Sequence, residues 1–128
     1  MTDASCYLIN KLSPEKRSEL LNDFFSPEKL GLSIVRLNVG SSDYATAAYN
    51  YDDVPGDREL KHFSVAHDEK WIIPCIQESC RIRPDLFLFA SPWSPPGWMK
   101  TTNSMCGGYM RAEFLPVFAD YLDRKSVV

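Results

Sequence analysis

Two short apolar runs alternate with amphipathic stretches along the chain. Residues 32–39 are mostly apolar and rich in β-branched side chains, and residues 86–90 are apolar throughout. Runs of this length, bounded by turn-forming residues, are typical of buried β-strands. Because strands that are apolar on both faces belong to parallel sheets covered by helices, the two runs predict two buried parallel strands.

Three amphipathic helices are expected around these strands. The first begins with Ser13 as its N-cap and ends near residue 26, where Gly31 then suits a left-handed residue after the helix end. The second opens at His67 and extends to about residue 83, with Pro74 marking where the regular helix begins or bends. The third covers about residues 114–125. The order helix, strand, helix, strand, helix predicts a parallel α/β arrangement.

The segment after the second strand is a rigid aromatic loop. It holds prolines at positions 92, 95 and 96, which cannot continue a β-ladder, and tryptophans at positions 93 and 98. In parallel α/β sheets the functional groups lie just beyond the carboxyl ends of the strands, and Trp93 stands at that end. A rigid indole offers a flat apolar face to a ligand such as a sugar ring. The alternative is that both tryptophans only pack; we expect packing for Trp98 and ligand contact for Trp93.

The end of the first strand also carries candidate functional residues. Asp43 lies just beyond it, followed by Tyr44 and a long irregular stretch over residues 44–66. Loops of this length in compact domains are usually functional or carry small elements of their own. Asp43 could merely cap a turn, but its place between a strand end and an aromatic loop favours a functional role. Arg36 is a charge within an apolar strand; it could reach a surface acid, but we favour an inward, functional placement.

The aromatic loop also carries a family resemblance. Residues 90–101 read Ala-Ser-Pro-Trp-Ser-Pro-Pro-Gly-Trp-Met-Lys-Thr. This segment closely resembles the third-strand segment of glycoside hydrolase family 30, in particular its glucosylceramidases. Residues 36–64 resemble the same family in an arginine-bearing strand, an aspartate, a tyrosine-rich loop and a Phe-Ser pair. A Thr-Asp-Ala segment at residues 2–4 is similar to the passage just after the first barrel strand of that family.

The resemblance implies a barrel of which this chain is one part. A complete (β/α)8 barrel takes about 250 residues, whereas this chain has 128. The expected fold is therefore α/β, a fragment of a (β/α)8 TIM barrel with about the second and third strands and their flanking helices. We expect residues 1–128 to form one partial barrel domain with no second domain, and Met1 to be an internal residue.

The resemblance also implies a reaction whose catalytic acids lie elsewhere. Family 30 enzymes are retaining glycosidases, in which one glutamic acid protonates the leaving oxygen and a second attacks the anomeric carbon. In the family these residues follow the fourth strand and lie near the seventh, and neither segment occurs here. We therefore expect no catalytic residue in this chain. Its glutamates fall on expected helices or outer loops: Glu15, Glu19, Glu28, Glu59, Glu69, Glu78 and Glu113.

The resemblance also implies roles for residues that support the reaction without being catalytic. It implies that Asp43 accepts hydrogen bonds from glucose hydroxyls, that Trp93 lines the same glucose subsite, and that Tyr44 stands beside the aspartate. It implies that Arg36 lies beneath the catalytic pair, where its charge would hold the nucleophilic carboxylate ionised. The implied activity is hydrolysis of glucosylceramide to glucose and ceramide, part of sphingolipid metabolism, without a cofactor or a metal. Two alternatives stay open: a non-catalytic carbohydrate-binding protein and a truncated product without activity.

Composition and charge limit the kinds of molecule that the chain is expected to bind. The chain has 17 acidic and 14 basic side chains, a net charge of -3 and no basic cluster. Nucleic-acid binding is therefore excluded, because it requires grouped lysine and arginine. No apolar run approaches the roughly 18 residues of a membrane span, and the first residues lack the pattern of a signal peptide. The expected substrate is a glucosyl lipid or β-glucoside, with peripheral lipid contact possible and a lysosomal or secreted location implied by the family. No pattern indicates an oligomeric state.

The cysteines and histidines show no metal-site pattern. Cys6, Cys75, Cys80 and Cys106 lack zinc-type spacing, so we interpret them as packing thiols. If the parent protein is exported, Cys6 or Cys106 could pair with a cysteine outside this chain. The two histidines, His62 and His67, are expected to be surface or capping residues.

Overall fold

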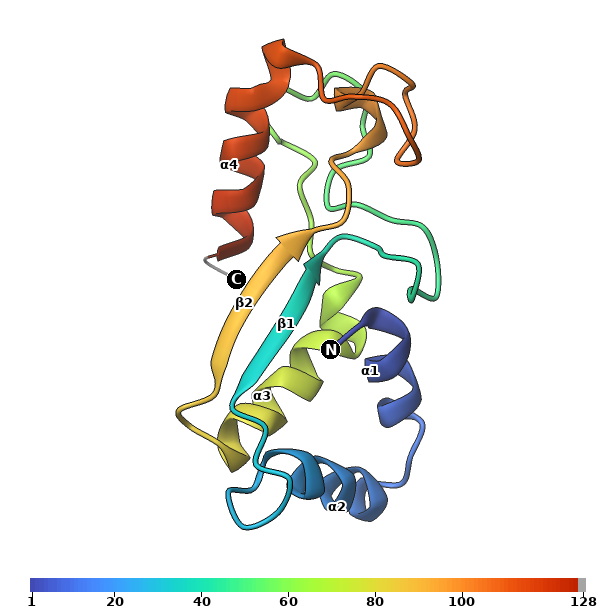
Figure 1. Cartoon of the computed structure of the whole chain (residues 1–128). Helices are drawn as coiled ribbons and strands as arrows, with labels where there is room; N and C mark the ends of the chain where they lie inside the picture. Colours follow the sequence, from blue (N-terminus) through green and yellow to red (C-terminus); the bar gives the residue numbers. More distant parts are fainter. Residues whose placement is uncertain (127–128) are drawn as a thin grey trace.

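The structure is a computed structural model that describes residues 1–126, with side chains through residue 124. A two-stranded sheet runs diagonally through the molecule, with three helices in the lower part of the view and a fourth helix beside the loops that follow the strands (Figure 1). The elements in chain order are α1 (Asp3–Asn10), α2 (Pro14–Phe25), β1 (Ile34–Val39), η1 (Asp68–Lys70), α3 (Ile72–Ile82), β2 (Phe87–Pro92), η2 (Gly97–Met99), η3 (Ala112–Phe114) and α4 (Leu115–Ser126).

The two strands are parallel, as the sequence predicts. Their register pairs Ile34 with Phe87, Arg36 with Phe89, and so on to Val39 with Pro92. Because side chains alternate along a strand, the even-numbered residues of β1 share one face with the odd-numbered residues of β2. Both strands end at the same level, and the loops that follow them leave from the same edge of the sheet (Figure 1).

Helices cover one face of β1. Val35 is 5% exposed and packs in a cluster formed by the two strand starts, α1, α2 and α3. The buried members of this lower cluster are Cys6, Leu21, Phe25, Val35, Ile72, Cys75 and Leu86. At the other end of the strands, Val39 packs in a second cluster beneath the loops and against α4, with Tyr51, Leu60, Trp98, Met99, Phe114, Val117 and Tyr121. This second hydrophobic cluster therefore supports the carboxyl ends of the strands.

The opposite face of the sheet is uncovered in this chain. Ile34 is 60% exposed, Phe87 is 61% exposed and Phe89 is 43% exposed. The expectation of buried strands is therefore wrong for this face of β1 and for both faces of β2, since Leu88 on the other face is 37% exposed. The physical reason is that two strands with helices on one side supply no second layer for the open face and no neighbour for the outer edge of β2.

The ladder ends at Pro92, as predicted, because no described residue after it continues the strand. Strand β2 continues through Ser91 to Pro92, which pairs with Val39. Pro92 has no amide hydrogen to donate, but at the last position of a strand the loss of one donor does not interrupt the ladder. Trp93 is therefore the first residue after the strand.

Most of the expected helices are confirmed, with two differences. Helix α2 is capped by Ser13, whose side chain accepts a hydrogen bond from the backbone N–H of Lys16, and Gly31 has a φ of 66°. The helix expected from His67 is divided into η1 and α3, with Pro74 in the first turn of α3. Helix α1 was not expected. No helix among the described residues is long and apolar enough to cross a membrane.

Candidate functional site

The residues expected to bind sugar lie in the loops after the two strands. Trp93 follows the last residue of β2 and is 51% exposed. Asp43 and Tyr44 follow β1 within a few residues, and both are exposed, Tyr44 by 66%. Because the parallel strands end at the same level, both loops begin at one edge of the sheet (Figure 1).

Arg36 lies beside Trp93. It belongs to the uncovered face of β1, and its guanidinium carbon is 5.2 Å from the centroid of the indole ring. A cation over an exposed aromatic face contributes about 0.5–1 kcal/mol. Among the described side chains, no carboxylate forms an ion pair with Arg36. The guanidinium therefore occupies one part of the indole surface and leaves the rest of its exposed surface open to a ligand.

The loop after Trp93 is fixed by buried polar contacts. Lys100 is 7% exposed, and its ammonium group donates to the hydroxyl of Ser94 at 3.1 Å and to the carbonyl of Met105 at 2.6 Å. The Ser94 hydroxyl itself donates to the Met105 carbonyl at 3.0 Å. These bonds join the Trp93 loop to the segment at residues 101–110. Sequence reasoning missed the role of Lys100, because a lysine in a polar loop gives no signal of burial.

Trp98 packs, as expected. It is 7% exposed, its indole N–H donates to the backbone carbonyl of Asp52 at 3.0 Å, and its ring meets Phe114 edge-on with centroids 5.1 Å apart. The two tryptophans of the aromatic loop thus differ in role, since one anchors the loop in the upper core and the other is exposed at the strand end.

The turn that carries Asp43 reaches back to the first turn of α1. The backbone N–H of Ala4 donates to the carbonyl of Tyr44 at 3.1 Å, and the N–H and hydroxyl of Thr46 donate to the carboxylate of Asp3. Within the turn, the Tyr44 N–H donates to the Ser42 hydroxyl at 3.2 Å. The Asp43 carboxylate makes no hydrogen bond or ion pair among the described residues, which leaves its oxygens available to a ligand.

A buried carboxylate holds the next part of the loop. Asp68 is 1% exposed and accepts hydrogen bonds from the hydroxyls of Tyr49 at 2.9 Å and Tyr51 at 2.7 Å. Burial and the adjacent negative charge of Asp68 raise the pKa of both tyrosines, so both hydroxyls stay protonated as donors. The tyrosine-rich loop is therefore anchored to η1 rather than free over the sheet.

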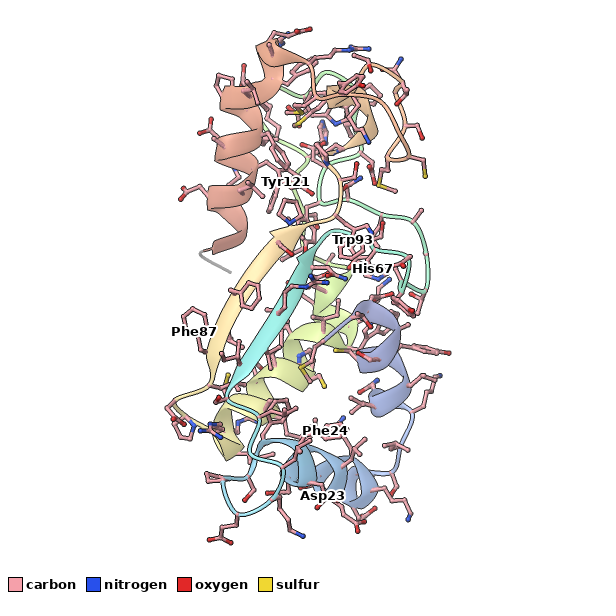
Figure 2. The ribbon with its side chains drawn as sticks, in the orientation of Figure 1. Asp23, Phe24, His67, Phe87, Trp93 and Tyr121 are labelled. Carbon is pink, nitrogen blue, oxygen red and sulfur yellow. The ribbon has the colours of Figure 1, made fainter. Side chains whose placement is uncertain are left out.

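His67 was expected to be a surface or capping residue. It stands at the N-cap position of η1, but its side chain makes no capping hydrogen bond and is only 18% exposed. Its ring is stacked on Tyr49 with centroids 3.7 Å apart, and its Nε2 atom lies 2.9 Å from Asp3 Oδ1. Figure 2 shows the ring near the carboxyl ends of the strands, in the same region as Trp93. The expectation fails because the partner of this histidine lies 64 positions away in the sequence. His62 is exposed, as expected.

The glutamates lie on the elements expected for them. They occupy α2, η1, α3, η3 and the connecting loops, and none among the described residues stands at the carboxyl end of a strand. Glu78 on α3 forms an ion pair with Arg17 at 3.0 Å, and Glu59 forms one with Lys61 at 2.7 Å. These positions are those of surface ion pairs on helices and loops.

The cysteines differ in their surroundings. Cys6 and Cys75 are buried and in contact, and the hydrogen bond between the thiols together with burial raises the pKa of Cys6. Packing is confirmed for these two, whereas Cys106 is exposed, so the packing interpretation is wrong for it. Among residues 1–126, no three His, Cys, Asp or Glu side chains gather where they could hold a metal ion.

Comparisons with known proteins agree with this architecture. The chain is 38% identical over 110 residues to the lysosomal acid glucosylceramidase of Mus musculus, covering 84% of this chain and 21% of that protein. It is 32% identical over 133 residues to the endo-1,6-beta-D-glucanase of Neurospora crassa, covering 95% of this chain and 28% of that protein. The crystal structure of SrfJ from Salmonella typhimurium superposes with a TM-score of 0.92 at 32% identity, covering 97% of this chain and 28% of that one.

These matches show which part of a larger fold the chain corresponds to. The chain spans about a fifth of the length of the first curated relatives it matches, at 21% and 20%. Its two parallel strands and their helices correspond to one segment of a TIM barrel, the fold that the resemblance implied. Residues 1–114 match the glycosyl hydrolase family 30 TIM-barrel domain, and the chain belongs to that family of glycoside hydrolases.

Proposed function

We propose that this chain supplies part of the glucose subsite of a retaining β-glucosidase that hydrolyses glucosylceramide to glucose and ceramide. The observation that carries the proposal is the pairing of Trp93 and Arg36 at the end of the strands, with the unpaired Asp43 carboxylate on the neighbouring loop. An exposed indole on a loop fixed by buried polar bonds can stack on a sugar ring at little entropic cost. Residues 1–128 form one partial catalytic domain in this proposal.

Each residue has a separate task. Asp43 accepts hydrogen bonds from sugar hydroxyls, and such charge-assisted bonds orient the ring as well as holding it. Tyr44 extends the aromatic surface beside it. Arg36 keeps a nucleophilic carboxylate ionised, because a fixed positive charge nearby lowers the pKa of a carboxyl group. The arginine lies on the uncovered sheet face, where it is exposed and forms no ion pair with a described side chain.

The two catalytic carboxyl groups belong to segments outside this chain. A retaining glycosidase needs them about 5 Å apart on either side of the scissile bond. The glutamates described here lie on helices and outer loops, and two of them are engaged with basic side chains. The chain alone therefore binds without cleaving.

The glucosyl lipid is favoured as the substrate because the mammalian relative is named a lysosomal acid glucosylceramidase. A lysosomal or secreted location and peripheral contact with a lipid surface go with that substrate. The second candidate is a β-1,6-glucan, which the similarity to the Neurospora crassa endo-1,6-beta-D-glucanase supports. Both substrates present a β-linked glucose to the same subsite.

The test is a direct comparison of the two substrates. The protein produced from its complete reading frame is given glucosylceramide in detergent or a β-1,6-glucan; released glucose is measured for the lipid, and new reducing ends are measured for the glucan. We expect turnover of the lipid and little or none of the glucan, and the reverse would reassign the substrate. Sugar binding without turnover on either would support the non-catalytic alternative.

The placement of the chemistry is tested on the 128-residue chain alone. It should show no turnover of an aryl β-glucoside, because the catalytic pair is outside it. Turnover that disappears in Glu113→Gln would contradict this placement. In the complete protein, Asp43→Ala should lower kcat/KM far more than Trp98→Phe, and equal kinetics for the two variants would remove Asp43 from the site.

A further inference from the structure

Asp3 is a buried carboxylate that gathers donors from two other parts of the chain. It is 3% exposed and lies in the first turn of α1. Its Oδ2 atom accepts hydrogen bonds from the N–H of Thr46 at 2.6 Å and from the Thr46 hydroxyl at 2.7 Å. Its Oδ1 atom accepts from the indole N–H of Trp71 at 2.5 Å and lies 2.9 Å from Nε2 of His67. Both carboxylate oxygens are thus fully used.

The carboxylate stays ionised in this setting. Burial alone would raise the pKa of Asp3, but the bonds from Thr46, Trp71 and His67 together lower it. Because an ionised carboxylate can only accept hydrogen bonds, Nε2 of His67 carries the proton in this contact. The histidine ring is itself held by its stack on Tyr49 and by an edge contact with Trp71.

The turn at residues 42–48, which carries Asp43, has few other attachments. Its base is closed by the N–H of Ser41, which donates to the Tyr49 carbonyl at 2.9 Å. Beyond the base, the hydrogen bonds that join the described turn to the rest of the chain all go to the first turn of α1. They are the two bonds from Thr46 to Asp3 and the bond from Ala4 to the Tyr44 carbonyl.

The first turn of α1 is a firm support for this attachment. The N-cap Thr2 accepts from the Ser5 N–H, and the Ser5 hydroxyl accepts from the Thr2 N–H. The reciprocal bonds fix the start of the helix. The helix in turn packs on α3 through the buried Cys6 and Cys75. The helical layer therefore holds the Asp43 turn through the Asp3 carboxylate and the Ala4 N–H, and among the described residues the carboxylate is the one side chain of α1 that takes part.

We propose that Asp3 is a positioning residue for the sugar-binding turn, acting through Thr46 to hold the Asp43 carboxylate at the strand end. The inference rests on the proposed glucose-binding role of Asp43. Asp3 itself is buried and touches no substrate. Its effect on the reaction is therefore expressed only while the Asp43 carboxylate is present.

The test is a double-mutant cycle in the protein produced from its complete reading frame, with an aryl β-glucoside as substrate. Asp3→Asn keeps the shape of the side chain but turns one acceptor into a donor that faces other donors. We expect kcat/KM to fall about tenfold in Asp3→Asn and about a hundredfold in Asp43→Ala. The double variant should be no worse than Asp43→Ala alone, because coupled residues are not additive.

Two further variants separate positioning from loss of stability. Thr46→Ser keeps both donors to Asp3 and should retain wild-type kcat/KM, whereas Thr46→Val removes only the hydroxyl and should lower it about threefold. This pair also carries the test if Asp3→Asn fails to fold. Leu21→Ala, in the buried lower cluster and remote from the turn, should lose stability with unchanged kcat/KM.

The possible results distinguish failure of this inference from failure of the proposed role of Asp43. Independent, multiplicative losses in Asp3→Asn and Asp43→Ala would show that Asp3 does not act through the turn and would overturn the inference alone. Equal kcat/KM values for Thr46→Ser and Thr46→Val would overturn it as well. Unchanged kinetics in Asp43→Ala would instead overturn the proposed role of that aspartate, and the inference with it.

Discussion

Replacing Trp93 by alanine tests the proposed sugar-binding surface directly. The indole is 51% exposed, and the guanidinium of Arg36 already occupies part of it at 5.2 Å from the ring centroid. Removal of the ring takes away the apolar surface on which a glucose unit would stack. It disturbs little of the core, because the packing of this loop depends on Trp98 and Lys100, both 7% exposed.

The expected loss follows from the exposed area. A tryptophan side chain offers up to about 250 Å², so the exposed half is roughly 125 Å². This exposed area is what remains with Arg36 in place, and a sugar ring stacked on one side of the indole would cover about half of it, or about 60 Å²; at ~25 cal/mol per Å² this contributes about 1.5 kcal/mol. Since about 1.4 kcal/mol is a factor of ten in affinity, Trp93→Ala should weaken sugar binding about tenfold.

The assay is inhibition by a glucose-shaped competitive inhibitor in the complete protein, measured as Ki for the wild type and the variant. Tyr109→Ala is the matched control, because Tyr109 is an aromatic side chain that is 83% exposed on a neighbouring loop. The inhibitor should bind that variant as tightly as the wild type. A change of less than twofold in Trp93→Ala, or an equal loss in both variants, would refute the stacking argument.

Two further predictions concern stability. Gly40 and Gly56 both have positive φ, so alanine costs about 1–2 kcal/mol at either position, but only at Gly40 would the new Cβ meet Asn50 Oδ1 at 2.9 Å and the Tyr49 carbonyl at 3.2 Å. Gly40→Ala should therefore be destabilised by at least about 1 kcal/mol more than Gly56→Ala in denaturant titrations, and equal losses would contradict the crowding at Gly40. Burial raises the pKa of Asp52 against the opposing bond from the Val54 N–H, with the nearby Asp57 carboxylate adding to the rise. The pKa of Asp52 in the folded protein thus exceeds the unfolded value of about 3.9. The free energy of unfolding should therefore fall as pH rises from about 4 through the raised pKa. Asp52→Asn should remove that part of the pH dependence.

Sequence patterns predicted the elements whose signals are local. The strands followed from their apolar runs, α2 from the Ser13 cap, and the exposure of Trp93 from its place after a strand and among prolines. Helix α1 was missed because it has eight residues, of which only Asp3 and Cys6 are buried, and its capping pair uses serine in place of the usual glutamate.

Local sequence patterns did not predict the contacts between distant segments. The approach of Arg36 to Trp93 depends on the strand register, which pairs Arg36 with Phe89 and brings the residues after β2 over the end of β1. The bonds of Asp3 to His67 and Trp71 cross 64 and 68 positions. No local pattern around Asp3 or His67 indicates that the two side chains are in contact. The local pattern placed Asp43 just beyond the first strand, and the family resemblance supplied the role expected of it.

The set of hydrogen bonds to the Asp3 carboxylate also has an evolutionary consequence. Positions 3, 46, 67 and 71 are joined by hydrogen bonds although they lie far apart along the gene product. A substitution at position 3 would leave four donors from three residues without their acceptor, so mutations at these sites are not independent events for selection. In an alignment of relatives we expect the four columns to change together, and lineages that lose the carboxylate to have replaced the histidine and the indole as well.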